Sequence, residues 1–289
     1  MADMLDAEVE LVPIRTSGDE HKGTVPSPER GRGSDPEDKS RFVKEIEEAL
    51  LRGDVDLAVH SAKDVPADLP EGLAIVGVPE RADARDALCG AASLDELADG
   101  ARIGTSSLRR RAQLLALRPD LCIEDLRGNV DTRLKRLAAG DFDALVLAAA
   151  GLERLGREEG EPIPPGDMTP AAGQGCLALE ARAGDEELSE LAAAITDPDG
   201  LQSLMAERAL VGALDATCNT PVAAHAEHVD GGLRVAAFVG LPDGSHWIRD
   251  ALDGGSDDPA GLGHAVAERL LAAGAADVLA QAERAAARG

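Results

Sequence analysis

Short apolar runs alternate with longer amphipathic segments over the first half of the chain. Runs with a period of two, or continuously apolar ones, predict strands, and apolar residues every three or four positions predict helices. The predicted strands are residues 9–14, 55–60, 73–78, 101–104, 121–126 and 144–148. The predicted helices are residues 42–51, 107–117 and 130–139. Strands that alternate with helices in this way are typical of an α/β fold with mostly parallel sheets.

The pattern changes after Pro170. The sequence there predicts two helices, three short strands and a final Ala-rich helical region, which together make a separate α+β module. These elements are residues 185–195 and 200–214, then 222–225, 233–239 and 245–251, then 259–287. Residues 16–39 interrupt the first half, because they are rich in Gly, Pro, Ser and charge, and they predict a mobile loop, a lid or a disordered segment.

The charge balance excludes one class of function. The 289 residues include 54 Asp and Glu against 29 Lys and Arg, a formal net charge of −25. Nucleic-acid binding by general charge attraction needs a basic face, so we exclude it. Only five lysines occur, at 22, 39, 44, 63 and 135. An acidic, lysine-poor surface is typical of halophilic adaptation, and an acidic protein of an ordinary cytoplasm is the alternative.

The four cysteines predict neither a zinc site nor a disulfide framework, because no C-x-x-C pair or nearby histidine gives metal-ligand spacing. Cys89, Cys122 and Cys176 lie in apolar stretches and are expected to be small core residues. No apolar run is long enough for a membrane span, and the first residues are acidic where a signal peptide would be basic. We therefore expect a cytoplasmic protein without a bound metal.

An arginine cluster opens one predicted helix. In G-T-S-S-L-R-R-R, Ser107 is a good N-cap, so Arg109, Arg110 and Arg111 fall in the first helical turn. The helix dipole disfavours cations there, by about 0.3–1 kcal/mol each. Three of them indicate compensation by a bound anion, which free backbone N–H groups would also hold. A solvated arginine face is the alternative.

Further basic residues follow other strands. L-R-G-N-V-D-T-R places Arg127 at a strand end and Arg133 in the first turn of the next helix, and Arg154 follows strand 144–148. Ligands of parallel α/β sheets bind beyond the carboxyl ends of the strands. Because guanidinium groups match carboxylates bidentately, the pattern predicts a substrate with several carboxylates.

Two other segments carry candidate chemistry. In H-S-A-K-D-V-P, Asp64 could stabilise a developing cation or exchange a proton, and Lys63 could bind a substrate carboxylate. A turn-capping role is the alternative for Asp64. Cys218 lies in the polar loop L-D-A-T-C-N-T-P-V, where it is either a covalent attachment point or a free thiol.

In this order, these motifs resemble the porphobilinogen deaminase family, whose members are also called hydroxymethylbilane synthases. The resemblance also includes V-E-L-V-P-I, F-V-K-E-I-E-E-A-L, A-A-G-L-E-R-L-G, G-Q-G-C-L-A-L-E and A-E-R-A-L. It implies two lobes like those of periplasmic binding proteins plus a small α+β domain that bears the cysteine. The implied domains are residues 1–80 with 176–195, residues 81–175, and residues 196–289.

The resemblance also implies the roles of the site residues. Cys218 would hold a dipyrromethane cofactor through a thioether, and Asp64 would be the catalytic carboxylate. Acetate and propionate groups would be bound by basic and hydroxyl side chains. For the cofactor these are Lys63, Ser107, Arg109, Arg110, Arg127 and Arg133, and for the substrate porphobilinogen Arg154, Arg109 and Arg133. The implied product is hydroxymethylbilane, formed from four porphobilinogen molecules with release of ammonia by a protein expected to be a monomer.

The sequence departs from the family at two places. Family members begin with a strand and helix that carry an R-x-S-x-L-A motif, and this chain starts M-A-D-M-L-D-A. Residues 38–42 also lack the glycines of the family's G-G-K-G-x-F turn. The alternative function is therefore an inactive or truncated homologue that acts as a two-lobed module binding carboxylates. A redox protein lacks the necessary cysteine spacing.

Overall fold

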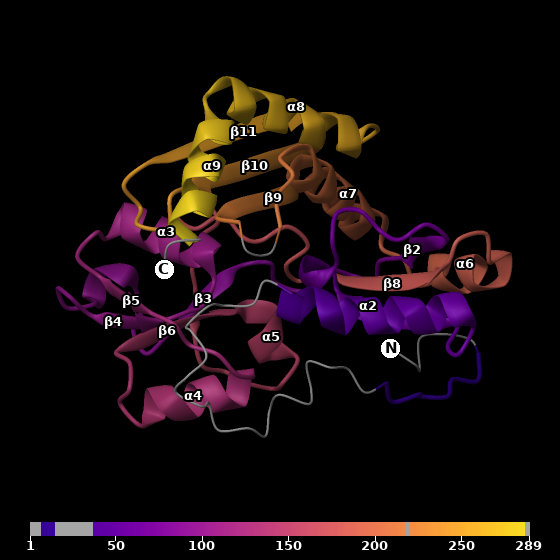
Figure 1. Ribbon diagram of the computed structural model, residues 1–289, viewed down its shortest axis with the longest axis horizontal. Coiled ribbons are helices and arrows are strands. Elements are labelled where there is room, and N and C mark those ends of the chain that lie inside the picture. Colours follow the sequence, from indigo (N-terminus) through magenta and orange to yellow (C-terminus); the bar gives the residue numbers. More distant parts are fainter. Residues whose placement is uncertain (1–6, 15–36, 218–219, 287–289) are drawn as a thin grey trace.

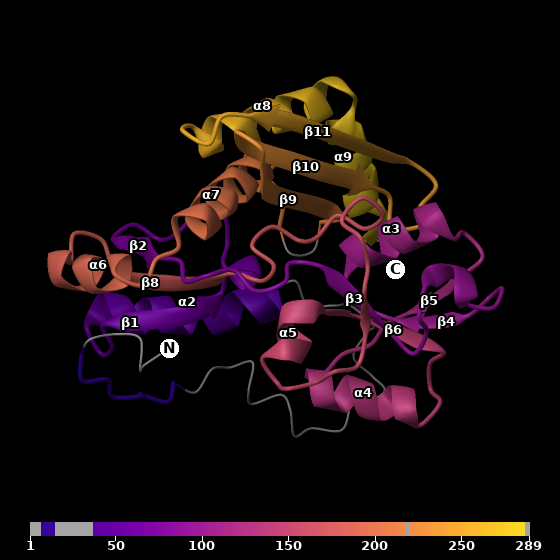
Figure 2. The ribbon, with the colours of Figure 1, turned by 180° about the vertical axis from the view of Figure 1, so that it is seen from behind.

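The computed structural model describes residues 7–14, 37–217 and 220–286. The strands of this part of the chain form three separate sheets (Figure 1). In Figures 1 and 2 the third sheet and its helices lie above the first two sheets, which lie side by side. Most of the interrupting segment predicted at 16–39 lies outside the described residues, and its last residues, 37–39, belong to a helix.

The first sheet combines strands from distant parts of the sequence. Its order is β1-β8-β2, and both pairings are antiparallel. The central strand is completely covered at Ala178, Leu179 and Ala181, since it has a neighbour on each side and α2 and α6 pack on the sheet. The elements are α2 Glu37–Arg52, β1 Leu57–Ser61, β2 Leu73–Gly77, β8 Leu177–Arg182 and α6 Glu186–Ala193.

The second sheet is mixed. Its order is β5-β4-β6-β3-β7, with β4 parallel to β5 and β6, and β3 antiparallel to β6 and β7. Side chains cap two of its helices: Ser107 accepts from Arg110 N, and Asn129 accepts from Thr132 N. The elements are β3 Asp86–Cys89, β4 Arg102–Gly104, α3 Leu108–Leu117, β5 Cys122–Glu124, α4 Val130–Ala138, β6 Ala144–Ala148, α5 Ala149–Glu153 and β7 Glu161–Pro162.

The third sheet is an antiparallel meander of order β11-β10-β9. Leucine, valine and alanine side chains from the sheet and its three helices form one core. The elements are α7 Pro198–Ala213, β9 Val222–Val229, β10 Gly232–Gly240, β11 Trp247–Gly254, α8 Pro259–Ala272 and α9 Ala275–Ala286. No helix in the described part of the chain is long and apolar enough to cross a membrane.

The expectation of mostly parallel sheets is wrong. Among the strands that the structure describes, only β4, β5 and β6, which follow one another through α3 and α4, pair in parallel. The alternating pattern predicts such neighbouring units well, because a helix crossover returns the chain in the same direction. It cannot show that β8, from far along the sequence, inserts antiparallel between β1 and β2. The α/β class is confirmed, and the strand direction is corrected.

Most predicted elements are confirmed, including strand 144–148 and the helices that became α3 and α4. The strand predicted at 9–14 is wrong: these residues have no regular structure, and Leu11 is 85% exposed. No neighbouring strand pairs with them in the described part of the chain. The core position predicted for Cys122 is also wrong, because it lies on the edge strand β5 and is exposed, whereas Cys89 and Cys176 are buried.

The chain crosses between the first and second sheets twice, outward between β2 and β3 and back between β7 and β8. The two crossings are bonded to each other. Arg81 of the outward crossing donates to the main-chain oxygen of Gln174 in the return crossing, at 3.0 Å from Nε and 2.9 Å from Nη2. Glu207 of α7 accepts from Arg81 Nη1 at 2.8 Å and from Gly173 N at 2.6 Å. The three sheets are therefore joined at one buried cluster.

The return crossing fits only a chain with glycine at 175. Gly175 has φ +87°, and an added Cβ would lie 2.3 Å from the carbonyl oxygen of Ala82. The two crossings bond here directly, since Ala82 N donates to Gly175 O at 3.2 Å. This close approach sets the position of the neighbouring Gln174 side chain.

Candidate active site

The Lys63–Asp64 pair lies in a tight turn that directly follows β1. The turn is a single 3-10 helix, Ala62–Asp64. It is held by Ala62 N, which donates to Cys176 O at 3.1 Å, and by Gly173, where an added Cβ would lie 2.9 Å from Lys63 N. The return crossing therefore fixes the position of this turn.

Asp86, at the start of β3, is the centre of a buried polar cluster. Its carboxylate accepts from Arg109 Nη1 at 2.6 Å, from Arg110 Nη2 at 2.8 Å and from Gln174 Nε2 at 2.9 Å. Burial alone would raise the pKa of Asp86, but the two guanidinium charges and these hydrogen bonds hold it well below its usual range. Asp86 is therefore ionised at neutral pH.

Arg109 and Arg110 are themselves buried and bonded to the protein. Arg109 also donates to Thr169 O at 2.9 Å, and Arg110 Nη1 donates to Val146 O at 2.8 Å. The sequence analysis placed both at a helix start, as observed, and expected a bound anion to compensate them. The structure instead supplies Asp86 as their compensating charge.

Lys63 lies beside this cluster. Its Nζ is 3.5 Å from Gln174 Oε1. Burial and the charges of Arg110 and Arg109 lower the pKa of Lys63 to about 8, although Asp64 and Asp86 oppose the shift. Burial is the largest of these effects, because the charges of two arginines and two aspartates act on Lys63 in opposite directions.

Arg133, in the first turn of α4, belongs to the same positive region. Burial, and then the charge of Arg110, lower its pKa. Its Nε donates to Gly128 O at 2.8 Å, and the described residues offer this guanidinium no carboxylate partner. Lys63, Arg109, Arg110 and Arg133 thus share one region, and Asp64 and Asp86 are the acids whose charges act on Lys63 there.

Four other residues that the sequence analysis assigned to the site differ in their surroundings. Ser107 caps α3 next to the two arginines, and Arg154 Nη2 donates to Gly175 O at 2.7 Å in the return crossing. Arg127 is exposed, and no described residue forms an ion pair with it. Cys218 lies outside the described residues, so its place relative to Asp64 stays a prediction.

Sequence reasoning missed Asp86 and Gln174. A signal for Asp86 was available: a charged residue heads the apolar run Ala87–Cys89, and a buried charge needs partners. Gln174 stands between two glycines in a motif that carried the resemblance, but no spacing rule links it to Lys63. Only the fold brings these residues together.

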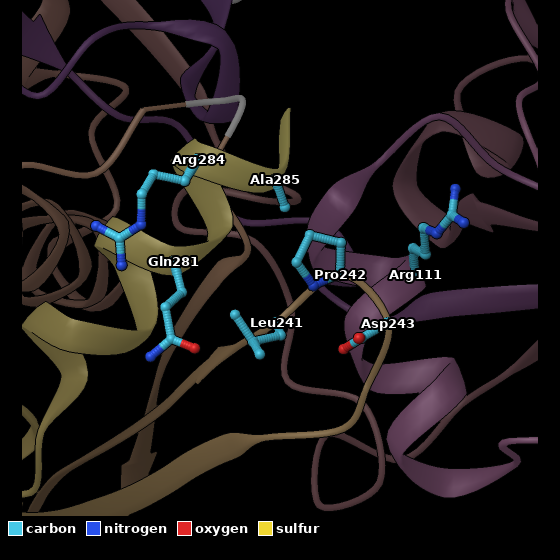
Figure 3. A pocket seen from close by; sticks show the side chains of 7 residues that line it. All are labelled: Arg111, Leu241, Pro242, Asp243, Gln281, Arg284 and Ala285. Atoms are coloured by element: carbon cyan, nitrogen blue, oxygen red, sulfur yellow. The ribbon is translucent and has the colours of Figure 1, made fainter. Parts of the chain in front are cut away.

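A cavity of about 390 Å³ lies elsewhere, between α3, the turn after β10 and α9. It is lined by Arg111, Leu241, Pro242, Asp243, Gln281, Arg284 and Ala285. Figure 3 shows that Arg111 and Arg284 extend away from each other rather than toward a common point. The cavity therefore lacks the convergent cations found around Asp86.

Comparison with known proteins identifies the family of this chain. Residues 1–190 match the profile "Porphobilinogen deaminase, dipyromethane cofactor binding domain", and residues 201–272 match "Porphobilinogen deaminase, C-terminal domain". The chain is 51% identical to the porphobilinogen deaminase of Roseiflexus castenholzii over 247 residues, which cover 84% of this chain and 81% of the relative. It is 45% identical to that of Thermus thermophilus over 282 residues, covering 96% and 89%.

Among solved structures, a periplasmic substrate-binding protein from Coxiella burnetii matches 54% of this chain and 77% of its own at 18% identity, with a TM-score of 0.36. The sequence matches are far more extensive, since the two profiles together span most of the chain. The chain belongs to the porphobilinogen deaminase family.

Proposed function

We propose that this protein condenses four molecules of porphobilinogen head to tail into hydroxymethylbilane, with release of ammonia. Membership of the family supports the reaction. The structural observation that carries it is the positive region of Lys63, Arg109, Arg110 and Arg133 beside Asp64. Each porphobilinogen brings an acetate and a propionate group, so a growing chain of pyrroles needs an excess of cations.

The residues of this region fit a dipyrromethane cofactor. Its carboxylates would complete the charge balance of Arg133, which has no carboxylate partner among the described residues. We propose that Lys63, Ser107, Arg127 and Arg133 bind these groups, and that Cys218 holds the cofactor through a thioether. When bound, the cofactor supplies the pyrrole carbon to which substrate is added.

Arg109 and Arg110 contribute differently in this proposal. Because they already donate to Asp86, Thr169 O and Val146 O, they act through their positive field and their remaining N–H groups. Arg154, anchored on Gly175 O, would bind the substrate carboxylates together with Arg109 and Arg133. These assignments follow the family motif position by position.

Asp64 is the proposed catalytic carboxylate. In its acid form it gives a proton to the leaving amine of porphobilinogen, the C–N bond breaks, and ammonia departs. The resulting carboxylate then faces the positive charge left on the substrate pyrrole, and it takes back the proton released when the new C–C bond forms. The fixed turn at Ala62–Asp64 supports such precise placement.

We further propose three domains: residues 1–80 with 176–195, residues 81–175, and residues 196–289. The composition of the sheets supports this division, since β1, β2 and β8 form the first, β3 to β7 the second and β9 to β11 the third. The paired crossings support an architecture for the first two like that of periplasmic binding proteins. Substrate would then bind between the lobes.

The decisive experiment measures the mass of the purified protein and its release of ammonia from porphobilinogen. We expect a covalent increment of one dipyrromethane, which reacts with Ehrlich's reagent and is lost in Cys218→Ala. The exposed Cys122 offers a matched control, because Cys122→Ala should keep the increment. We expect Asp64→Ala to keep the increment and lose turnover. An unmodified Cys218 with binding but no ammonia release would instead indicate a carboxylate-binding module.

A further inference from the structure

The Gly173–Gly175 loop places the side chain of Gln174 between the Ala62–Asp64 turn and the buried acid Asp86. Gln174 is 1% exposed. Its main-chain oxygen is held by Arg81, and the glycines on both sides have φ of +70° and +87°. The loop therefore allows this side chain little freedom to move.

The amide of Gln174 is oriented by its two donor bonds. Nε2 donates to Ala84 O at 2.7 Å and to Asp86 Oδ1 at 2.9 Å. Both amide hydrogens are thereby used, so the carbonyl oxygen must face the opposite way. Oε1 lies 3.5 Å from Lys63 Nζ and accepts a hydrogen bond from that ammonium group.

We propose that Gln174 is a positioning residue for the deaminase site: its oriented carbonyl holds the Lys63 ammonium toward the substrate carboxylates and couples it to the Asp86–Arg109–Arg110 cluster. Its role in turnover rests on the proposed function, whereas the coupling to Lys63 does not. Gln174 touches no reacting atom in this assignment and acts through Lys63.

The charges that face Lys63 come from three elements. Asp64 lies in its own turn, Asp86 starts β3, and Arg109 and Arg110 belong to α3. The neutral Gln174 carbonyl adds an acceptor without adding charge. Losing this acceptor disfavours the ammonium form, and replacing it by a carboxylate favours that form. Two replacements of similar size therefore shift the Lys63 pKa in opposite directions.

The test is a direct titration of Lys63 in the full-length protein. Because the chain has only five lysines, lysine labelled with ¹³C gives five side-chain signals, and Lys63→Arg identifies the one of interest. We expect Gln174→Met to lower the Lys63 pKa from about 8, and Gln174→Glu to raise it by about one unit or more. Gln113→Met is the control, since Gln113 is also buried but bonds to Thr169.

The outcomes separate this proposal from a purely structural role and from the proposed function. A structural role would shift the Lys63 pKa equally in Gln113→Met, or in the same direction in both Gln174 variants, and either result would overturn the coupling. The alkaline limb of kcat/KM should move with the titrated pKa in each variant. If the protein releases no ammonia, the proposed function fails while the titration still decides the coupling. Opposite pKa shifts with an unmoved alkaline limb would overturn the role in turnover alone.

Discussion

Arg109 Nη1 lies 2.6 Å from Asp86 Oδ2, and both side chains are buried where α3 meets β3. This bond places a guanidinium group and an acid at the same junction as Gln174 and Lys63. The cations of the site are therefore not held by ligand alone, because the protein supplies one fixed counter-charge for them. In the proposed function, stability and substrate binding therefore depend on the same few residues.

Replacing Asp86 should be costly. Asp86→Asn leaves Arg109 and Arg110 buried without their carboxylate, so we expect a loss of about 3–5 kcal/mol in the free energy of unfolding, measured with urea at pH 7. The exposed pair Arg234–Asp253 provides the control, since Asp253→Asn should cost less than about 1 kcal/mol. Equal losses in the two variants would contradict the importance of the cluster.

The stability difference between wild type and Asp86→Asn should depend on pH. The pKa of Asp86 is depressed in the folded protein, so its stabilisation is complete above the pKa of about 4 of an unfolded aspartate. It is lost as pH falls toward the lower folded value. The difference in unfolding free energy between wild type and Asp86→Asn should therefore shrink below about pH 4, and a constant difference would contradict the prediction.

Lys63 should have the opposite effect on stability. Its folded pKa of about 8 lies below the value of about 10.4 for an unfolded lysine, so holding the ammonium destabilises the folded state below pH 8. That cost disappears as pH rises from 8 to about 10. We expect Lys63→Met to be more stable than wild type to urea at pH 7 but not at pH 10. The exposed Lys135→Met should change little at either pH.

Arg133 should matter for binding rather than folding. We expect Arg133→Gln to raise the KM for porphobilinogen at least about tenfold, because a hydrogen bond to a charged group contributes about 1.5–3 kcal/mol. Arg136→Gln is the control on the same helix, since Arg136 pairs with Asp141 at the surface. Both are compared in protein whose mass shows the bound cofactor. A similar KM in the two variants would remove Arg133 from the site.

Gly175 tests the close contact between the crossings. We expect Gly175→Ala to cost about 1–3 kcal/mol more unfolding free energy than Gly100→Ala. Both glycines have positive φ, +87° and +73°, but an added Cβ meets Ala82 O at 2.3 Å only at 175 and meets nothing within 4 Å at 100. The comparison thus separates steric overlap from backbone strain. Equal costs would mean that the crossings do not need this approach.

The acidic composition gives a prediction about salt. A net charge of −25 repels itself less when the screening length falls to about 3 Å at 1 M salt. If the composition is a halophilic adaptation, the midpoint of thermal unfolding should rise from dilute buffer to molar KCl. A flat or falling midpoint would favour an acidic protein of an ordinary cytoplasm.

The local elements could be predicted from the sequence, and their partners could not. Strand 144–148 was predicted at its observed bounds, and Ser107 was recognisable as a cap because its side chain acts on a neighbouring residue. The position of β8 depends on contacts across more than a hundred residues, and so does the bond between Lys63 and Gln174. Periodicity carries no information about such distant pairing.

The site shows the same division. The basic residues could be found because each follows a strand or opens a helix, yet the sequence could not show that Arg109 and Arg110 turn onto Asp86. It also could not distinguish Cys122, on an exposed edge, from the buried Cys89 and Cys176. The direction and the burial of a side chain depend on how the strands and helices pack, which local sequence does not show.

The bond between Ala82 N and Gly175 O joins the outward and return crossings side by side, so the first and second sheets are connected by two bonded segments rather than by two independent ones. Two segments that are bonded side by side resist sliding and twisting, but they can still bend together. If the space for each added pyrrole enlarges by rotation about these crossings, Lys63 and Asp64 lie close to the axis, because Ala62 N bonds to Cys176 O beside Gly175. Residues near an axis move least, so Lys63 and Asp64 would keep their geometry while the product lengthens.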